Sequence, residues 1–144
     1  MRWGLLLKYV RALLRYLWAS PTTAIGLLLA TLALAGKGRC RIVSGVLEVH
    51  GGLVAPLLRR VTFLPGGAAA ITFGHVVLGR DQTRLDATRY HERVHVSQCE
   101  RWGPLFLPVY VGASLWALAR NRHPYRDNFF EREAFDAESG QQMG

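Results

Sequence analysis

Two apolar runs, separated by a stretch rich in glycine and β-branched residues, set the pattern of the chain. The first run covers residues 16–36 and holds 21 consecutive uncharged residues, YLWASPTTAIGLLLATLALAG. A helix needs about 20 such residues to cross the hydrocarbon core of a bilayer. Before the run, Lys8, Arg11 and Arg15 recur at helical spacing opposite leucines, which is typical of a helix at a membrane surface. We therefore predict an apolar and basic membrane anchor over residues 1–38.

Two other interpretations of the first run remain open. An A-x-A pattern at residues 33–35 is also typical of a signal-peptide cleavage site, and a helical hairpin in a soluble core has the same hydropathy. Ser20 and Pro21 are typical of a helix cap followed by the first helical residue, so we expect a break there. Basic residues flank the run on both sides, so the positive-inside rule assigns no orientation and no side to the domain.

Between residues 39 and 80 the pattern changes to short β-rich segments. RIVSGVLEVHGG, RRVTFLPGGAAA and ITFGHVVLGR are rich in Val, Ile, Thr and Phe, and they are separated by the turn signals Gly51-Gly52 and Gly66-Gly67. This stretch predicts three or four short strands in a small antiparallel sheet.

From Leu85 on, the pattern is helical. The segment LDATRYHERVHVSQCERW predicts a helix that is capped by Asp86 and stops at Gly103. The last segment, DNFFEREAFDAESG, predicts a second helix between the cap Asn128 and a stop at Gly140.

A second apolar run lies between these two predicted helices. It holds 18 uncharged residues, 102–119, and includes Pro104, Pro108 and Gly112, which disfavour a straight membrane span. A core helix, a re-entrant element and a short span are the three interpretations of this run.

The net charge of +8 lies entirely in the first part of the chain. Residues 1–60 hold nine basic side chains and one acidic side chain, whereas residues 61–144 hold nine of each. Basic side chains among leucines suit an anionic lipid surface, and the chain has no DNA- or RNA-binding motif. We therefore expect a lipid bilayer, and not nucleic acid, as a partner. Cys40 and Cys99 are too few for a disulfide framework and lack CxxC spacing.

The candidate chemistry lies in the first predicted helix, where residues 91–95 read HERVH, an HExxH motif. His91 and His95 are four residues apart, so on a helix they share a face and can bind one metal ion. Glu92 lies about 100° away from that face, which predicts a general base for a metal-bound water and not a ligand.

A catalytic zinc commonly has three protein ligands and one position for water, so a third ligand is expected downstream. Position 98 is Gln and position 101 is Arg, which excludes the HExxHxxGxxH pattern. The side chains that remain able to bind a metal are Cys99, Glu100, His123, Asp127, Glu131, Glu133, Asp136 and Glu138.

The position of these candidates along the helices narrows the choice. Cys99 lies eight residues after His91, about 12 Å along a helix axis, and Glu100 is farther still, so neither can share an ion with His91. The last predicted helix must then supply the ligand. We favour Glu131, because a small residue follows it on the same face and allows that helix to approach the HExxH helix closely.

The pair of an HExxH helix and a later helix with residues 131–134, EREA, resembles the gluzincin family. That resemblance implies a zincin-like fold, peptide-bond hydrolysis, and zinc held by the two motif histidines and Glu131. Phe135 stands where gluzincins often have Asp, so Asp127 and Asp136 are the candidates to support the histidines.

A looser similarity covers about two thirds of the chain. The segments GHVVLGRD, HERVHVSQCERWGPLFLPVY and YRDNFFEREAF are similar to those of small bacterial proteins with an N-terminal apolar segment. This similarity carries no substrate, but it implies the bacterial inner membrane as the location.

These features together predict an α+β fold. We expect a minimal zincin-like domain over residues 39–144, made of a small antiparallel sheet, an HExxH helix and a second ligand helix, behind an N-terminal apolar helical anchor. The expected function is that of a membrane-associated zinc metallopeptidase with Glu92 as general base. An edge strand within residues 70–78 is the expected site of pairing with an extended substrate.

The 35 residues between His95 and Glu131 contain the second apolar run, so closing the metal site folds that run back beside the HExxH helix. We therefore expect the cleft at the bilayer surface and membrane-proximal peptides or proteins as substrates. One alternative is a non-catalytic, membrane-associated zinc-binding structural or interaction protein, whose metal has four protein ligands. The other is an interfacial protein without metal, in which Glu131 is a capping-box residue of the helix after Asn128.

Overall fold

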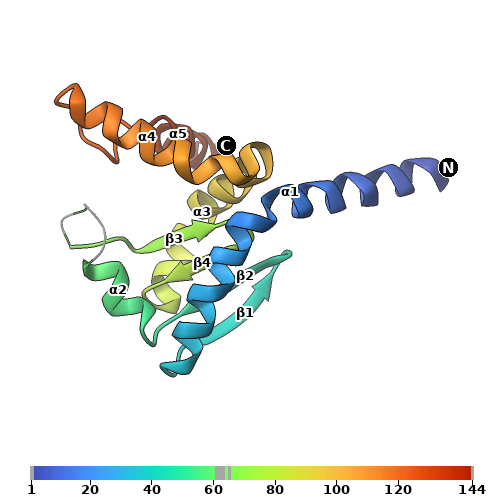
Figure 1. Ribbon diagram of the computed structural model, residues 1–144, viewed down its shortest axis with the longest axis horizontal. Helices are drawn as coiled ribbons and strands as arrows, with labels where there is room; N and C mark the ends of the chain where they lie inside the picture. The colour runs from blue at the N-terminus through green and yellow to red at the C-terminus, as the bar shows by residue number, and fades with distance from the viewer. Residues whose placement is uncertain (1, 61–63, 65, 144) are drawn as a thin grey trace.

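The computed structural model describes residues 2–60, 64 and 66–143 of the chain. The fold is α+β, as the sequence predicts, with a small sheet between helices (Figure 1). In chain order the elements are α1 (Arg2–Ala35), β1 (Arg39–Val43), β2 (Val46–His50), α2 (Val54–Arg60), β3 (Ala70–Phe73), β4 (Val76–Gly79), α3 (Gln82–Trp102), the 3-10 helix η1 (Gly103–Leu105), α4 (Phe106–Ala119) and α5 (Phe129–Gln142).

The sheet has the strand order β1-β2-β4-β3 and is mixed, so the prediction of an antiparallel sheet is wrong. The pairs β1/β2 and β3/β4 are antiparallel hairpins, but β2 and β4 run parallel because the chain crosses over through α2 between the hairpins. Val54 and Leu58, one helical turn apart in α2, are buried in the core beside the sheet. The predicted strand character after α2 falls on residues 61–63 and 65, which lie outside the described residues.

Helices cover both faces of the sheet. On one face, Val76 and Leu78 of β4 pack in a core with residues of α1 and α2. On the other face, Val77 packs in a cluster with Leu85 and Val96 of α3. The central strand β4 is therefore buried on both sides, and α3 lies against the sheet along most of its length.

The first helix is continuous, so the predicted break at Pro21 is wrong. Pro21 has no N–H for the carbonyl of Leu17, and the hydroxyl of Ser20 donates to that oxygen instead, at 2.7 Å. Figure 1 shows α1 changing direction midway, as an internal proline causes. Its N-terminal half projects from the molecule, and its C-terminal half packs on the sheet.

The packed half of α1 presents small residues to the sheet. Ala30 and Ala33 are buried in the same core as β4, and a Cβ on Gly26 would lie 2.7 Å from the Cβ of Val76. The opposite side of this half remains apolar and exposed, with Leu28 64% exposed. The predicted boundary at residue 38 stays a prediction, but the anchor segment shares a core with the strands that follow it.

Helix α3 begins three residues earlier than the sequence predicts. The cap is Asp81, whose carboxylate accepts a hydrogen bond from the backbone N–H of Arg84 at 2.9 Å. Asp86, the predicted cap, instead accepts hydrogen bonds from the side chains of Arg41 and Arg89. The helix ends where predicted, at Gly103, which has a φ of 54° that favours glycine.

The second apolar run forms η1 and α4. Two helical stretches of the described chain, 3–35 and 82–119, are long and apolar enough to cross a membrane by length and composition. The predicted cap of α5 is confirmed, since the side chain of Asn128 accepts from the N–H of Phe130 at 2.9 Å. Gly140 does not end α5, which continues to Gln142.

Candidate metal centre

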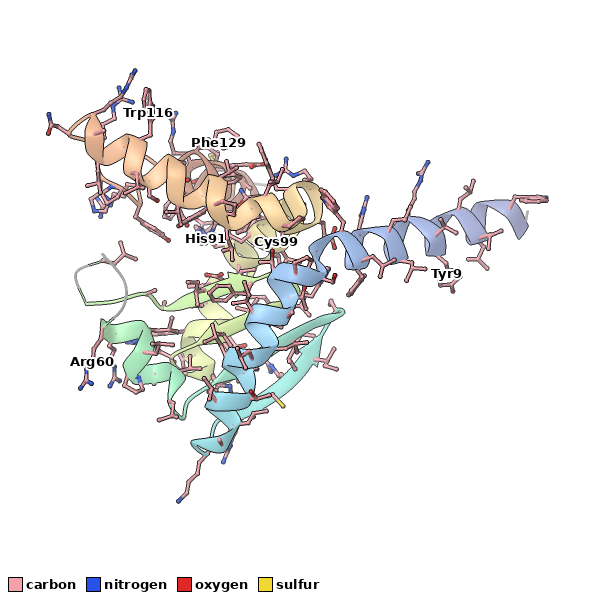
Figure 2. The ribbon with its side chains drawn as sticks, in the orientation of Figure 1. Tyr9, Arg60, His91, Cys99, Trp116 and Phe129 are labelled. Atoms are coloured by element: carbon pink, nitrogen blue, oxygen red, sulfur yellow. The ribbon has the colours of Figure 1, made fainter. Side chains whose placement is uncertain are left out.

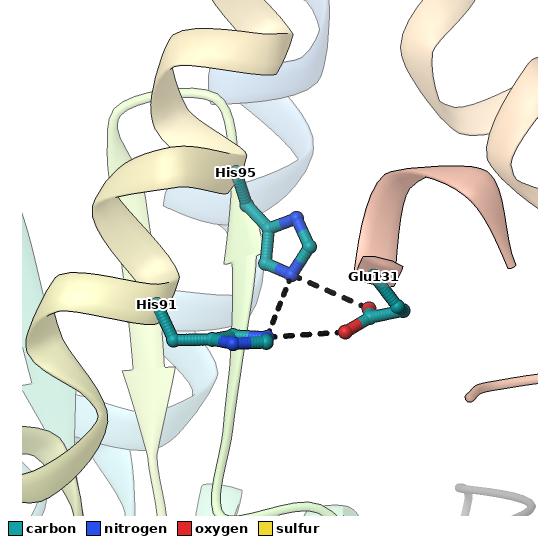
Figure 3. Close-up of side chains that lie close together, drawn as sticks. All are labelled: His91, His95 and Glu131. Carbon is teal, nitrogen blue, oxygen red and sulfur yellow. Dashed lines mark hydrogen bonds and ion pairs between the residues drawn. The ribbon is translucent and has the colours of Figure 1, made fainter. Parts of the chain in front are cut away.

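The two motif histidines lie one turn apart on α3, on a buried face of the helix. Each is 5–6% exposed, and their Nε2 atoms are 3.2 Å apart. Both rings point away from the sheet toward α5, as Figure 3 shows.

The third member of the group, Glu131, comes from the first turn of α5. Its Oε2 lies 3.0 Å from Nε2 of His91, and its Oε1 lies 3.3 Å from Nε2 of His95. Ala134, one turn later, is fully buried, as the prediction of a close helix approach requires. The structure thus brings together the three side chains that the sequence suggested, and Glu131 contacts the histidines instead of closing a capping box.

The spacing of these atoms fits a metal ion. Donor atoms about 2.05 Å from a tetrahedral zinc ion lie about 3.3 Å from one another. Nε2 of His91 lies 3.2 Å from Nε2 of His95 and 3.0 Å from Oε2 of Glu131, whereas the 3.3 Å contact of His95 is with the other carboxylate oxygen, Oε1. One donor atom from each of the three residues lies within 4.8 Å of the other two. His91, His95 and Glu131 can therefore hold one metal ion in common.

Gln98 determines which nitrogen of His95 is available to a metal. The Gln98 side-chain amide donates to the carbonyl of Phe130 at 3.0 Å and to Glu133 at 2.9 Å, and both of these partners accept only. Its oxygen must then face Nδ1 of His95, which lies 2.8 Å away and donates to it. In the neutral ring the proton is consequently on Nδ1 and the lone pair is on Nε2, the atom that faces His91 and Glu131.

The far side of the His91 ring contacts different residues. Its Nδ1 lies 3.6 Å from Oε2 of Glu138, and its ring packs against Phe135 at 4.8 Å between ring centroids. The sequence suggested Asp127 or Asp136 for this purpose. The carboxylate of Asp127 instead accepts from the backbone N–H of His123 at 2.8 Å, and Asp136 lies at an exposed position on α5.

Glu131 is ionised in this setting. Burial alone would raise the pKa of its carboxyl, but hydrogen bonds with His91 and His95 outweigh burial and lower the pKa to about 2. The hydroxyl of Tyr110 also donates to Oε1 of Glu131. Burial, and then the charge of Glu131 and a hydrogen bond with it, raise the pKa of the Tyr125 phenol.

Glu92, the predicted general base, is also buried but points to a different partner. The hydroxyl of Thr72 donates to Oε2 of Glu92 at 2.7 Å. Thr72 belongs to β3, which is an edge strand of the sheet. The carboxylate of Glu92 is therefore held between the motif helix and the strand edge expected to pair with substrate.

The other predicted candidates lie elsewhere. Cys99 is buried in an apolar cluster that includes Phe106, and burial raises the pKa of its thiol to about 12. Glu100 pairs with Nε2 of His75 at 3.0 Å, and Glu133 pairs with Arg101. Within the described part of the chain, the group of converging metal-binding side chains thus has three members.

Sequence reasoning missed three residues at this site: Gln98, Tyr110 as a partner of Glu131, and Thr72. Gln98 gave a signal, because it stands three residues after His95 and thus on the same helix face. Tyr110 and Thr72 gave none, because their positions depend on how α4 and β3 pack against α3 and α5.

Comparisons of the chain with protein-family models, with curated proteins and with solved structures found no significant match.

Proposed function

We propose that this protein is a membrane-associated zinc metallopeptidase. The observation that carries the proposal is the convergence of donor atoms of His91, His95 and Glu131 within 4.8 Å of one another, with the buried Glu92 on the same helix as the two histidines. A catalytic zinc site has three protein ligands and an open fourth position, whereas structural sites are closed by four. The three-membered group supports the catalytic alternative.

The donor set supports zinc in particular. Two imidazole nitrogens and one carboxylate oxygen form a His₂Glu set, which is a known ligand set of catalytic zinc. Hydrogen bonds to the far side of a ligating histidine fix its ring and raise its basicity. His95 has such a hydrogen bond to Gln98, which supports a role as a metal ligand.

In the proposed reaction, His91, His95 and Glu131 would hold a zinc ion, which would supply a water of lowered pKa, about 7, and a Lewis acid for the substrate carbonyl. Glu92 takes a proton from the attacking water and returns it to the leaving amine, so one carboxylate serves as base and then as acid. The hydrogen bond from Thr72 orients that carboxylate between the two steps.

The edge strand β3 is the proposed docking site for the peptide. It pairs with β4 on one side only, and its other edge is free for an extended backbone among the described strands. Thr72 lies on this strand and contacts Glu92, so a peptide paired with β3 would run past the general base.

The proposed location is a membrane, and the proposed substrates are membrane-proximal peptides or proteins. Two helical stretches have the length and apolarity of membrane spans. The N-terminal half of α1 projects from the sheet with exposed leucines and basic residues, among them Lys8 and Arg11 (Figure 1).

Metal analysis combined with a peptidase assay in lipid vesicles tests the proposal. We expect one zinc per chain, and we expect Glu92→Gln to keep the zinc and lose hydrolysis. Asp136→Asn, at an exposed position on α5, is the matched control and should keep both. Loss of zinc in Glu92→Gln with retention in Glu131→Gln would reverse the two roles, and a zinc-loaded but inactive wild type would establish the non-catalytic alternative.

A further inference from the structure

The polarity of α4 is inverted relative to that of an ordinary surface helix. Its only polar side chains, Tyr110 and Ser114, are one turn apart and point inward, where both are partly buried. Its outward side is wholly apolar: Leu115 is 60% exposed, Trp116 62% and Leu118 48%. Figure 2 shows Trp116 on the side of α4 that faces away from the sheet.

The inward side of α4 is fastened to the metal centre. Tyr110 donates its hydroxyl hydrogen to Glu131, the proposed third ligand. Asn128, which is fully buried, donates to the carbonyl of Tyr110 at 3.0 Å and to the hydroxyl of Ser114 at 2.8 Å. The same Asn128 caps α5 through the N–H of Phe130. The position of α4 therefore determines both where α5 begins and where the carboxylate of Glu131 lies.

The charged residues next to α4 in the sequence are basic. The sequence has no acidic residue between Glu100 and Asp127, whereas Arg120, Arg122 and Arg126 follow α4. The guanidinium of Arg120 lies 4.4 Å from the centre of the Trp116 ring. An apolar helix side with tryptophan and arginine at its end is complementary to the acyl chains and headgroups of an anionic bilayer.

The projecting half of α1 also has exposed apolar and basic side chains, and it meets the start of α4 at η1. A Cβ on Gly103 would lie 2.4 Å from the ring of Trp18, so α1 is in close contact with η1, which leads into α4. From there α1 and α4 extend in opposite directions along one side of the molecule, with the sheet on the other side (Figure 1).

We infer that an anionic bilayer binds the outward side of α4 and thereby regulates the metal centre. Docking holds α4 against α5, and Tyr110 and Asn128 then keep Glu131 beside the two histidines. A second copy of the chain is a poorer occupant, because pairing two such basic surfaces brings like charges together. This inference rests on the metal site of the proposed function, but not on its hydrolytic activity.

The experiment measures zinc affinity by competition with a chromophoric chelator. The wild-type protein is compared in neutral detergent, in phosphatidylcholine vesicles, and in vesicles that contain phosphatidylglycerol. We expect zinc to bind at least fivefold more tightly in the anionic vesicles than in the other two. In the double variant Leu115→Gln/Trp116→Gln we expect this response to disappear. The control Ile42→Gln, at an exposed apolar position on β1, should keep the full response.

Tyr110→Phe separates docking from its effect on the metal. We expect this variant to float with anionic vesicles as the wild type does, but to lose most of the vesicle response of zinc affinity. If the double variant fails to fold, Leu118→Gln alone replaces it.

Equal zinc affinity in all three conditions, or a full response in the double variant, would overturn the inference. A wild-type dimer that the double variant dissociates would identify a second copy as the occupant and overturn it as well. Bound zinc without peptidase activity would refute the proposed function alone, and bound zinc without a vesicle response would refute this inference alone.

Discussion

The side-chain oxygen of Gln98 accepts a hydrogen bond from Nδ1 of His95 at 2.8 Å. This contact places the lone pair of the neutral ring on Nε2. The amide cannot turn around, because its nitrogen donates to the carbonyl of Phe130 and to Glu133. Arg101 in turn pairs with Glu133, so a chain of contacts runs from the protein surface to the metal-facing atom. The glutamine takes the place of the acidic residue that often supports such a histidine.

Replacing Gln98 with methionine should weaken zinc binding about 10- to 100-fold, the usual effect of removing a partner of a ligating histidine. Methionine has a similar shape but cannot accept the Nδ1 proton or hold the amide contacts. Chelator competition measures the effect. The control Gln141→Met, at an exposed position on α5, should bind zinc as the wild type does. Unchanged zinc affinity in Gln98→Met would show that the tautomer of His95 does not need this contact.

Removal of either motif histidine should abolish stoichiometric metal binding. With His91→Ala or His95→Ala, only two of the three donor atoms within 4.8 Å remain. Elemental analysis of protein purified with and without added zinc measures the loss. His123→Ala is the control, because His123 lies outside the group and should leave one zinc per chain. Full zinc retention in the double variant His91→Ala/His95→Ala would refute the metal centre.

Thr72→Val should slow peptide hydrolysis at least tenfold while it leaves zinc content unchanged. The substitution keeps the shape of the side chain but removes the hydroxyl that donates to Glu92, so the carboxylate loses its orientation beside the strand edge. The rate at saturating peptide, measured with zinc-loaded protein, reports this effect. The partly buried Thr88, whose hydroxyl donates within α3 to the carbonyl of Arg84, supplies the control Thr88→Val. A variant that loses zinc together with activity would assign Thr72 a structural role instead.

The geometry of the three-membered group was predictable because it depends on local helix geometry. The spacing of His91 and His95 fixes their common face, and Ala134 indicates how closely α5 approaches. The cap Asn128 was predictable for the same reason, since capping depends on neighbouring residues.

Features that depend on contacts distant in sequence were predicted wrongly or not at all. The parallel pairing of β2 and β4 depends on the crossover through α2. Asp81 caps α3, whereas the carboxylate of Asp86 accepts hydrogen bonds from arginines of β1 and α3. The continuation of α1 through Pro21, by contrast, has a local cause that was overlooked, since the hydroxyl of Ser20 replaces the missing donor.

The buried carboxylate of Glu48 should make stability dependent on pH. Glu48 is 2% exposed and receives two hydrogen bonds from Arg89, at 2.8 and 3.0 Å, with Arg41 and Arg93 also in contact. Burial alone would raise the pKa of Glu48, but the arginines, Arg89 foremost, hold it below the ordinary value of 4.5. The contacts of ionised Glu48 therefore stabilise the folded protein fully above the pKa that Glu48 has in the unfolded chain. This stabilisation is lost as the pH falls through the lower pKa that Glu48 has in the folded protein.

Glu48→Gln should accordingly lower the free energy of unfolding by roughly 3 kcal/mol near neutral pH, because it leaves three partly buried arginines without a counter-charge. Its stability should then change less than that of the wild type as the pH falls below 4.5. Urea unfolding followed by circular dichroism at several pH values measures both effects. Asp136→Asn, at an exposed position, should change stability by less than about 0.5 kcal/mol. A parallel pH dependence in Glu48→Gln and wild type would contradict this assignment.

The contact between α1 and the sheet gives the last prediction. A Cβ at position 26 would lie 2.7 Å from the Cβ of Val76 and 2.9 Å from the carbonyl oxygen of Phe73, and backbone cannot yield as a flexible side chain does. Gly26→Ala should therefore destabilise the fold by about 1–3 kcal/mol, the usual cost of overpacking, although alanine is the better helix former. Gly4 stands in the projecting half of the same helix with nothing within 4 Å, so Gly4→Ala should be neutral or stabilising by up to about 1 kcal/mol.

Urea unfolding in neutral detergent, with far-UV circular dichroism as the signal, compares the two variants. Opposite signs for the two substitutions would show that the C-terminal half of α1 belongs to the folded core while the N-terminal half does not. Equal effects at both positions would mean that α1 does not pack on the sheet in solution and acts as a separate anchor along its whole length. In that case residues 16–36 would be free to span a bilayer, as their hydropathy alone predicts.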